Sequence, residues 1–265
     1  LKLLFKDGVK VESLDDYGDV VFDNTCFYAE SGGQVSDTGT IENENTSCLV
    51  EDVQHAPNKQ NLHHVKVLYG SINIGDEFTL KIDTKKRLLT MRNHSAAHLL
   101  DQTLFDVLGE HVAQQGSYVS SEYLRFDFNH YEKINEETLA NIERIVNEKI
   151  AEALEVKVAV LPIEEAKKLG AKALFTEKYG DTVRVVLMGD YSKEFCGGTH
   201  VSNTEEIGIF AIESEESIAS GTRRIIARTS LGAYELFKKR KHILDKVKNK
   251  LGAKSIFECE DRLNS

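Results

Sequence analysis

Two short motifs hold the residues of this chain that are best suited to chemistry. They are His-Ser-Ala-Ala-His at residues 94–98 and Cys-Gly-Gly-Thr-His at residues 196–200. Each carries two nitrogen or sulfur donors four positions apart, a spacing that puts His94 and His98 on one face of a helix. Together the motifs supply a common tetrahedral ligand set for zinc: His94, His98, Cys196 and His200. They therefore predict a Zn²⁺ site, one per chain, provided that the fold brings them together.

Each motif alone has a plainer interpretation, as two solvated histidines or as a buried free thiol. The His-Glu-x-x-His signature of zinc peptidases is absent, because Ser95 follows His94 where a glutamate would be required. Cys196 suits a ligand better than a nucleophile, since a thiolate bound to zinc is a damped nucleophile. If all four residues bind, the site is closed and zinc organises a pocket. If one position stays open, zinc can activate water.

The composition is that of a soluble globular protein large enough for one or two domains. The chain has 265 residues, of which 41% are hydrophobic and 29% charged. No run approaches the ~18 apolar residues of a membrane span. The cysteines are scattered without a disulfide pattern, which fits a reducing cytoplasm: Cys26, Cys48, Cys196 and Cys259. The missing initiator Met favours a piece of a longer protein.

A net charge of −10 argues against a general electrostatic nucleic-acid binder. A partner could still be held by a local basic patch. The candidates are residues 85–87, Arg223-Arg224 with Arg228, and residues 238–241. Each patch alone is more typical of a solvated helix face or strand edge.

Residues 1–83 are predicted to form a small antiparallel β-barrel. Several short strands without helical periodicity are typical of such a barrel. Gly39, Gly70 and Gly75 punctuate the β-prone runs, and Gly-Gly-Gln at residues 32–34 interrupts one of them. The runs lie at residues 20–22, 25–28, 49–53, 63–68 and 77–82.

Residues 84–229 are predicted to form a two-layer α/β domain that contains the zinc site, which makes the fold class α+β. A long helix should begin at Asp83 or Thr84 and end at Gly109, so the first motif lies on a rigid mid-helix backbone. Asn135 caps a second helix, whose apolar face should lie on a sheet. Residues 111–117 are interpreted as a polar segment that ends in a turn. The remaining elements are strands at 123–128, 156–161, 182–187, 207–213 and 223–228 and a helix at 163–169.

Residues 230–265 follow as a basic helical connector at the start of a truncated C-terminal region. The helix itself is expected at residues 231–250, where lysine and arginine alternate with apolar residues. It is interpreted as a connector or as the start of a coiled coil.

Four motifs occur together in a fixed order. They are Thr-x-Phe-Tyr-x-Glu-x-Gly-Gly-Gln-x-x-Asp-x-Gly at 25–39, the two motifs above, and Leu-Arg-Phe-Asp-Phe at 124–128. In this combination the chain resembles, over nearly its whole length, the editing region of alanyl-tRNA synthetases and the free-standing proteins that deacylate mischarged alanine tRNA. The related editing domain of threonyl-tRNA synthetases shares the first histidine motif but lacks the barrel with Gly-Gly-Gln. The basic connector and the missing Met favour a synthetase fragment.

The resemblance implies roles for individual residues. It assigns the zinc ligands to His94 and His98 of the first motif and to Cys196 and His200 of the second. It implies that Gln114 and Thr25 belong to the catalytic pocket. It also implies that tRNA is bound by four further residues: Arg223, Arg224, Gly197 and Gly198.

The implied reaction is hydrolysis of the ester that joins serine or glycine to the 3′ end of tRNA(Ala). The full-length protein would attach alanine to this tRNA with ATP, in the cytoplasm, with neither a membrane nor DNA as partner. The pocket must refuse alanine, which lies between glycine and serine in size. A buried polar group achieves this if the serine hydroxyl satisfies it and the alanine methyl leaves it unpaired.

The sequence is also compatible with three other functions. The chain could be a free-standing deacylase, a non-catalytic tRNA-binding module stabilised by zinc, or a zinc hydrolase of small substrates. The acidic charge balance weakens the second and the absent peptidase signature weakens the third.

Overall fold

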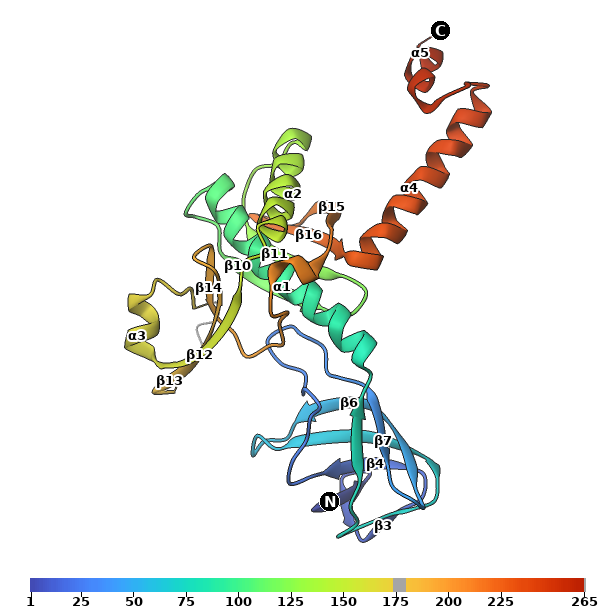
Figure 1. The fold of residues 1–265 in the computed structure, drawn as a ribbon, viewed down its shortest axis with the longest axis vertical. Coiled ribbons are helices and arrows are strands. Elements are labelled where there is room, and N and C mark those ends of the chain that lie inside the picture. The colour runs from blue at the N-terminus through green and yellow to red at the C-terminus, as the bar shows by residue number, and fades with distance from the viewer. Residues whose placement is uncertain (174–179, 265) are drawn as a thin grey trace.

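The computed structural model describes residues 1–173 and 180–264. Its N-terminal part is a seven-stranded antiparallel sheet of order β2-β1-β4-β7-β6-β5-β9 (Figure 1). The strands are β1 Leu3–Lys6, β2 Val9–Val11, β4 Tyr17–Val21, β5 Gly39–Glu42, β6 Ser47–His55, β7 Asn61–Tyr69 and β9 Thr79–Ile82. Their inward side chains form one apolar core, which includes Leu4, Val20, Ile41 and Val65.

The predicted barrel is not closed. Among the described residues no ladder joins the outer strands β2 and β9. Both strands are short. After β2 the chain leaves this sheet, and β3 Ser13–Leu14 pairs with β8 Ile72–Asn73 in a separate two-stranded sheet. Short edge strands of this kind end a sheet rather than bridge it. The antiparallel strands themselves are confirmed, except that residues 25–28 lie outside every strand.

Helix α1, Thr84–Leu108, is the centre of the second part of the chain. Asp83 caps it by accepting a hydrogen bond from the Lys86 backbone N–H at 3.0 Å. It ends at Gly109, whose φ of 114° suits glycine. Residues 93–101 are buried without a break, so the helix is enclosed on all sides there. The predicted helix and its caps are therefore confirmed.

A four-stranded antiparallel sheet of order β10-β11-β16-β15 packs against α1 and against α2, Glu136–Ala151. Its strands are β10 Gln114–Val119, β11 Leu124–Asn129, β15 Phe210–Ala219 and β16 Thr222–Thr229. The two helices lie on one side of the sheet (Figure 1), and the largest apolar core fills the layer between the helices and the sheet. Asn135 caps α2, as predicted. The polar run at 114–119 is a strand after all, because pairing with β11 overrides its weak β-propensity.

A smaller sheet carries the second motif. It has the order β12-β13-β14, with strands Val156–Pro162, Thr182–Met188 and Ser192–Phe195, and α3, Ile163–Lys168, packs on it. Strand β14 ends one residue before Cys196. The 3-10 helix η1, Thr204–Ile207, follows the motif and packs against α1 and α2.

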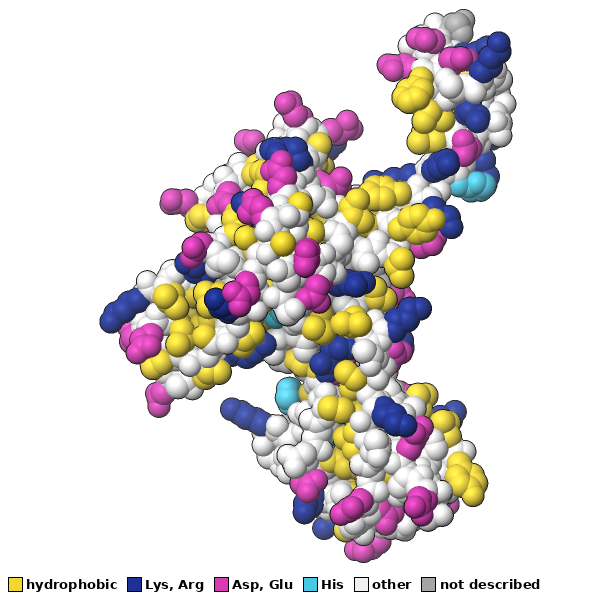
Figure 2. Space-filling model, in the orientation of Figure 1, with side chains coloured by type: hydrophobic (Ala, Val, Ile, Leu, Met, Phe, Trp, Pro, Cys, Tyr) yellow, Lys and Arg dark blue, Asp and Glu magenta, His cyan; other side chains and the backbone are white. Residues whose placement is uncertain are grey.

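The basic helix is α4, Ser230–Lys250, followed by η2, Ile256–Glu258, and α5, Cys259–Leu263. The first three turns of α4 are anchored, because Ala233 and Leu236 meet Ala211 of β15 and Arg240 donates to the Ile212 carbonyl at 2.8 Å. The rest extends away from the body (Figure 1). Hydrophobic side chains gather over α4 (Figure 2), among them Leu231, Tyr234 and Phe237. No helix of the described residues is both long and apolar enough to cross a membrane.

Truncating a buried apolar side chain of α1 should destabilise the fold. Leu104 is fully buried, so Leu104→Ala should lower the free energy of unfolding by about 2–5 kcal/mol through lost burial and a cavity. Leu88 on the same helix is 41% exposed, so Leu88→Ala should cost less than about 1 kcal/mol. Urea unfolding followed by circular dichroism gives both values. Equal losses would contradict the central position of α1.

Candidate metal centre and adjoining cavity

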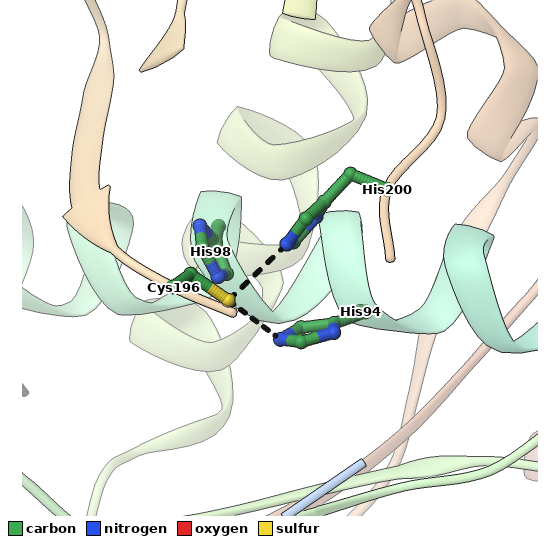
Figure 3. Close-up of side chains that lie close together, drawn as sticks. All are labelled: His94, His98, Cys196 and His200. Carbon is green, nitrogen blue, oxygen red and sulfur yellow. Dashed lines mark hydrogen bonds between the residues drawn. The ribbon is translucent and has the colours of Figure 1, made fainter. Parts of the chain in front are cut away.

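The fold brings the two motifs together, as the sequence predicted. His94 and His98 project from successive turns of α1, and Cys196 and His200 approach from the loop after β14 (Figure 3). One donor atom from each of the four residues lies within 4.8 Å of the other three. Cys196 Sγ is 3.5 Å from His94 Nε2 and 3.3 Å from His200 Nε2. Tetrahedral zinc would separate its nitrogen and sulfur ligands by about 3.5 Å, so this group fits a metal ion.

Two of the three histidines have a hydrogen-bond partner on the nitrogen that points away from the cluster. His94 Nδ1 lies 2.7 Å from Gln34 Oε1, and His200 Nδ1 lies 3.1 Å from Ser95 Oγ. An amide oxygen only accepts, so His94 carries its proton on Nδ1 and offers the Nε2 lone pair to the cluster. Partners of this kind orient the ligands of metal sites.

His98 gives the clearest sign that a cation belongs here. Its Nδ1 is 3.3 Å from Glu194 Oε2, but the geometry is not that of a hydrogen bond. Both ring nitrogens are buried and, among the described residues, have no hydrogen-bond partner. A buried orphan of this kind costs about 1–3 kcal/mol. Both nitrogens of His98 would gain a partner if a metal ion bound one of them and a slight rotation of the ring brought the other to Glu194.

Burial sets the protonation of the four ligands. It lowers the pKa of His94 to about 3 and the pKa values of His98 and His200 well below the ordinary value, so all three imidazoles are neutral donors. Burial raises the pKa of the Cys196 thiol to about 12. A bound dication reverses this last preference, because it stabilises the thiolate directly.

A cavity of about 330 Å³ adjoins the cluster. Cys196, His94 and His98 form part of its wall. Its other polar lining comes from Tyr28, Ser31, Gln114, Ser117, Thr182, Arg184 and Glu194. Phe126 of β11 and Phe195 of β14 contribute apolar surface. The cavity is near the small end of ligand pockets and combines apolar walls with a few converging polar groups.

The structure gathers some of the predicted pocket residues here and not others. Gln114, Gly197 and Gly198 line the cavity, and the Gln114 amide donates to Ser117 Oγ at 3.2 Å. Thr25 is not among the lining residues. Its hydroxyl lies 2.8 Å from His63 Nε2 and accepts from the Phe27 backbone N–H at 3.1 Å.

The two predicted arginines also lie away from the cavity lining. Arg223 is buried and forms an ion pair with Glu215 on the neighbouring strand. Arg224 donates two hydrogen bonds to Asp127, at 2.7 and 2.8 Å. Both pairs tie β16 to an adjacent strand, so each arginine has a structural role in the sheet.

Several residues of the site have no individual signal in the sequence. Gln34 and Ser95 stand inside recognised motifs, but nothing in the motifs says that they contact histidines. Glu194 is two residues before Cys196, and burial raises its pKa well above the ordinary value. Arg184 lines the cavity and donates to the Cys196 carbonyl. Only the tertiary structure identifies these contacts.

Two family models match parts of the chain. The family model described as "Threonyl and Alanyl tRNA synthetase second additional domain" matches residues 183–226, and that described as "tRNA synthetases class II (A)" matches residues 3–86. The first match contains Cys196 and His200 of the cluster. Both models describe tRNA synthetases, and each matches less than half of the chain.

Similar proteins identify the family more closely. The chain is 55% identical over 234 residues to "Alanine--tRNA ligase" of Listeria welshimeri, which covers 88% of the chain and 27% of that protein. It is 50% identical over 251 residues to the protein of the same name from Shouchella clausii, covering 94% and 29%. For the one from Bacillus thuringiensis, identity is 51% over 250 residues, covering 94% and 28%. The chain belongs to the alanyl-tRNA synthetase family and spans less than a third of the length of these relatives.

Metal content tests the cluster directly. We expect about one zinc per chain in protein purified without added metal, and little zinc in the double variant His94→Ala/Cys196→Ala, which removes half of the ligands. The matched control is His55→Ala/Cys26→Ala, which changes an exposed histidine and an exposed cysteine elsewhere. Elemental analysis gives the stoichiometry. Zinc retained in the first variant, or absent from the unmodified chain, would refute the assignment.

Proposed function

We propose that this chain is the editing part of an alanine–tRNA ligase. It hydrolyses the ester that joins serine or glycine to the 3′ end of tRNA(Ala), while the full-length protein attaches alanine with ATP. The observation that carries the proposal is the cavity beside the His/Cys cluster, which is lined by residues of both motifs and by Gln114. Its volume of about 330 Å³ suits an aminoacyl group with part of the terminal ribose.

Zinc is the metal that this ligand set favours. Three neutral imidazoles and one thiolate are a soft-to-borderline set, typical of tetrahedral zinc. With all four ligands bound the site is closed, and zinc then holds the cavity wall in place. His94, His98 and the loop that carries Cys196 and His200 are thereby fixed beside the substrate. Aminoacyl esters are labile, so correct placement of the ester and of a water supplies much of the rate.

The polar groups of the cavity carry the selectivity. Gln114, Ser117 and Thr182 line it and can pair with the serine hydroxyl. The alanine methyl leaves such a group unpaired in a buried place, whereas glycine leaves room for a water. Gln114 is the residue that both the resemblance and the cavity support. The discriminating role assigned to Thr25 stays a prediction, and its bond with His63 offers a structural role instead.

The boundaries 1–83, 84–229 and 230–265 are proposed as the domain division. One apolar core is built only from residues in the first range, and the largest core only from residues in the second. All four cysteines are free, which supports the cytoplasm as the compartment.

Changing Gln114 should alter the choice between substrates. Gln114→Met keeps the length of the side chain and removes its amide, so hydrolysis of seryl-tRNA should slow relative to alanyl-tRNA. A buried group that loses its partner costs about 1–3 kcal/mol, which is roughly a 5- to 150-fold change in this ratio. Deacylation of seryl-, glycyl- and alanyl-tRNA(Ala) at equal concentration measures it, with glycine expected to change less than serine.

Thr25→Val is the paired variant in the same assay. It removes the hydroxyl and nearly keeps the shape of the side chain. If this variant alone shifts the ratio of seryl- to alanyl-tRNA hydrolysis, Thr25 is the discriminating residue and the role of Gln114 is wrong. If all three rates fall together in either variant, that residue supports the fold or general positioning.

The contact of Arg223 and Arg224 with the acceptor end also remains a proposal. If either binds a phosphate, the double variant Arg223→Ala/Arg224→Ala should edit more slowly and show a flatter dependence of the rate on salt. Lys246→Ala, an exposed change on α4, is the control. A loss of thermal stability with an unchanged salt dependence would mean that the ion pairs with Glu215 and Asp127 are purely structural.

A further inference from the structure

Gln34 connects the N-terminal sheet to the metal centre. It follows the tight turn at Gly32-Gly33, and its side chain is 1% exposed. Two backbone hydrogen bonds dock this turn on β10: the Val35 N–H donates to the Val119 carbonyl at 3.0 Å, and the Val119 N–H donates to the Gly33 carbonyl at 2.7 Å. The turn is thus held at the edge of the four-stranded sheet, next to the cluster.

The Gln34 amide bonds to both metal motifs at once. Its Oε1 accepts from His94 Nδ1 at 2.7 Å and from the Thr199 backbone N–H at 2.9 Å. Its Nε2 donates to Thr199 Oγ1 at 2.9 Å. The backbone donor fixes which end of the amide is oxygen. One side chain therefore sets the tautomer of His94 and holds the loop between Cys196 and His200.

Glycines on both sides make this close approach possible. A Cβ on Gly198 would lie 2.0 Å from His94 Cε1 and 2.9 Å from Gln34 Oε1. A Cβ on Gly33 would lie 2.7 Å from the Ser117 carbonyl oxygen, and its φ of +87° also favours glycine. The Gly-Gly-Gln turn and the Cys-Gly-Gly-Thr-His motif can therefore pack closely against their neighbours only because these positions are glycines.

We infer that Gln34 is a positioning residue that prepares His94 for the metal and couples metal binding to docking of the N-terminal sheet. The inference rests on the proposed metal site. Because Gln34 holds His94 and Thr199 only when the turn is docked, the metal favours the docked turn, and the docked turn favours the metal to the same extent. The Gly-Gly-Gln motif thus contributes to the metal centre without supplying a ligand.

Metal affinity in three variants tests the positioning role. Gln34→Met keeps the side-chain length but removes the acceptor, and should weaken binding of zinc about 10- to 100-fold in competition with a chromophoric chelator. Gln34→Glu keeps an acceptor for His94 and for Thr199, because the Thr199 hydroxyl can turn to donate. This variant should therefore bind zinc almost as tightly as the unmodified chain. Gln54→Met is the control, because the Gln54 amide donates to Glu30, in the segment between β4 and β5, and to Asp52 of β6.

Hydrogen exchange in the same variants tests the coupling. Adding zinc to the metal-free chain should slow exchange of the Val35 and Val119 amides, and should do so in Gln54→Met but not in Gln34→Met. Unchanged zinc affinity in Gln34→Met, or no rescue by Gln34→Glu, overturns the positioning role. Equal zinc protection of both amides in Gln34→Met overturns the coupling. If the unmodified chain binds no zinc, the metal site itself fails and this inference with it.

Discussion

Three imidazoles and a thiol are buried against one another, and a metal ion would give them a shared partner. Burial keeps the histidines neutral, and the two buried nitrogens of His98 have no hydrogen-bond partner among the described residues. Without a cation these groups would weaken the middle of the largest core, since unpaired buried polar groups cost free energy. A bound metal ion would give all four groups a common partner. The elements around the cluster can be understood as the means of holding it.

Helix α1 supplies that support because it is enclosed on all sides at the first motif. The four-stranded sheet and α2 pack on its apolar positions, and the loop after β14 brings Cys196 and His200 to its two histidines (Figure 3). The N-terminal sheet adds a polar contact through Gln34, in addition to the ion pair between Asp37 and Arg87 at the start of α1. Apolar packing positions the helix, and hydrogen bonds set the orientation of the ligands.

Charge on the four-stranded sheet is largely compensated. Arg223, Arg224 and Arg228 each pair with a carboxylate on the same or an adjacent strand. The acidic chain therefore presents no extended basic surface on this sheet, and recognition of an acceptor end would depend on the shape and the polar groups of the cavity. Arg184 is the one arginine among the described residues that line it.

The four candidate ligands, the helix that carries two of them and the family could all be predicted from the sequence. These features are local: four-residue spacing, the caps at Asp83 and Gly109, and short motifs in a fixed order. The sequence misjudged what depends on pairing between distant segments, such as the closure of the N-terminal sheet and the strand at residues 114–119. Only the tertiary structure showed that Gln34 contacts His94 across 60 residues of chain and that Thr25 lies outside the cavity lining. The reason is physical: spacing along one helix fixes which side chains share a face, but contacts between distant segments follow from packing that no local pattern encodes.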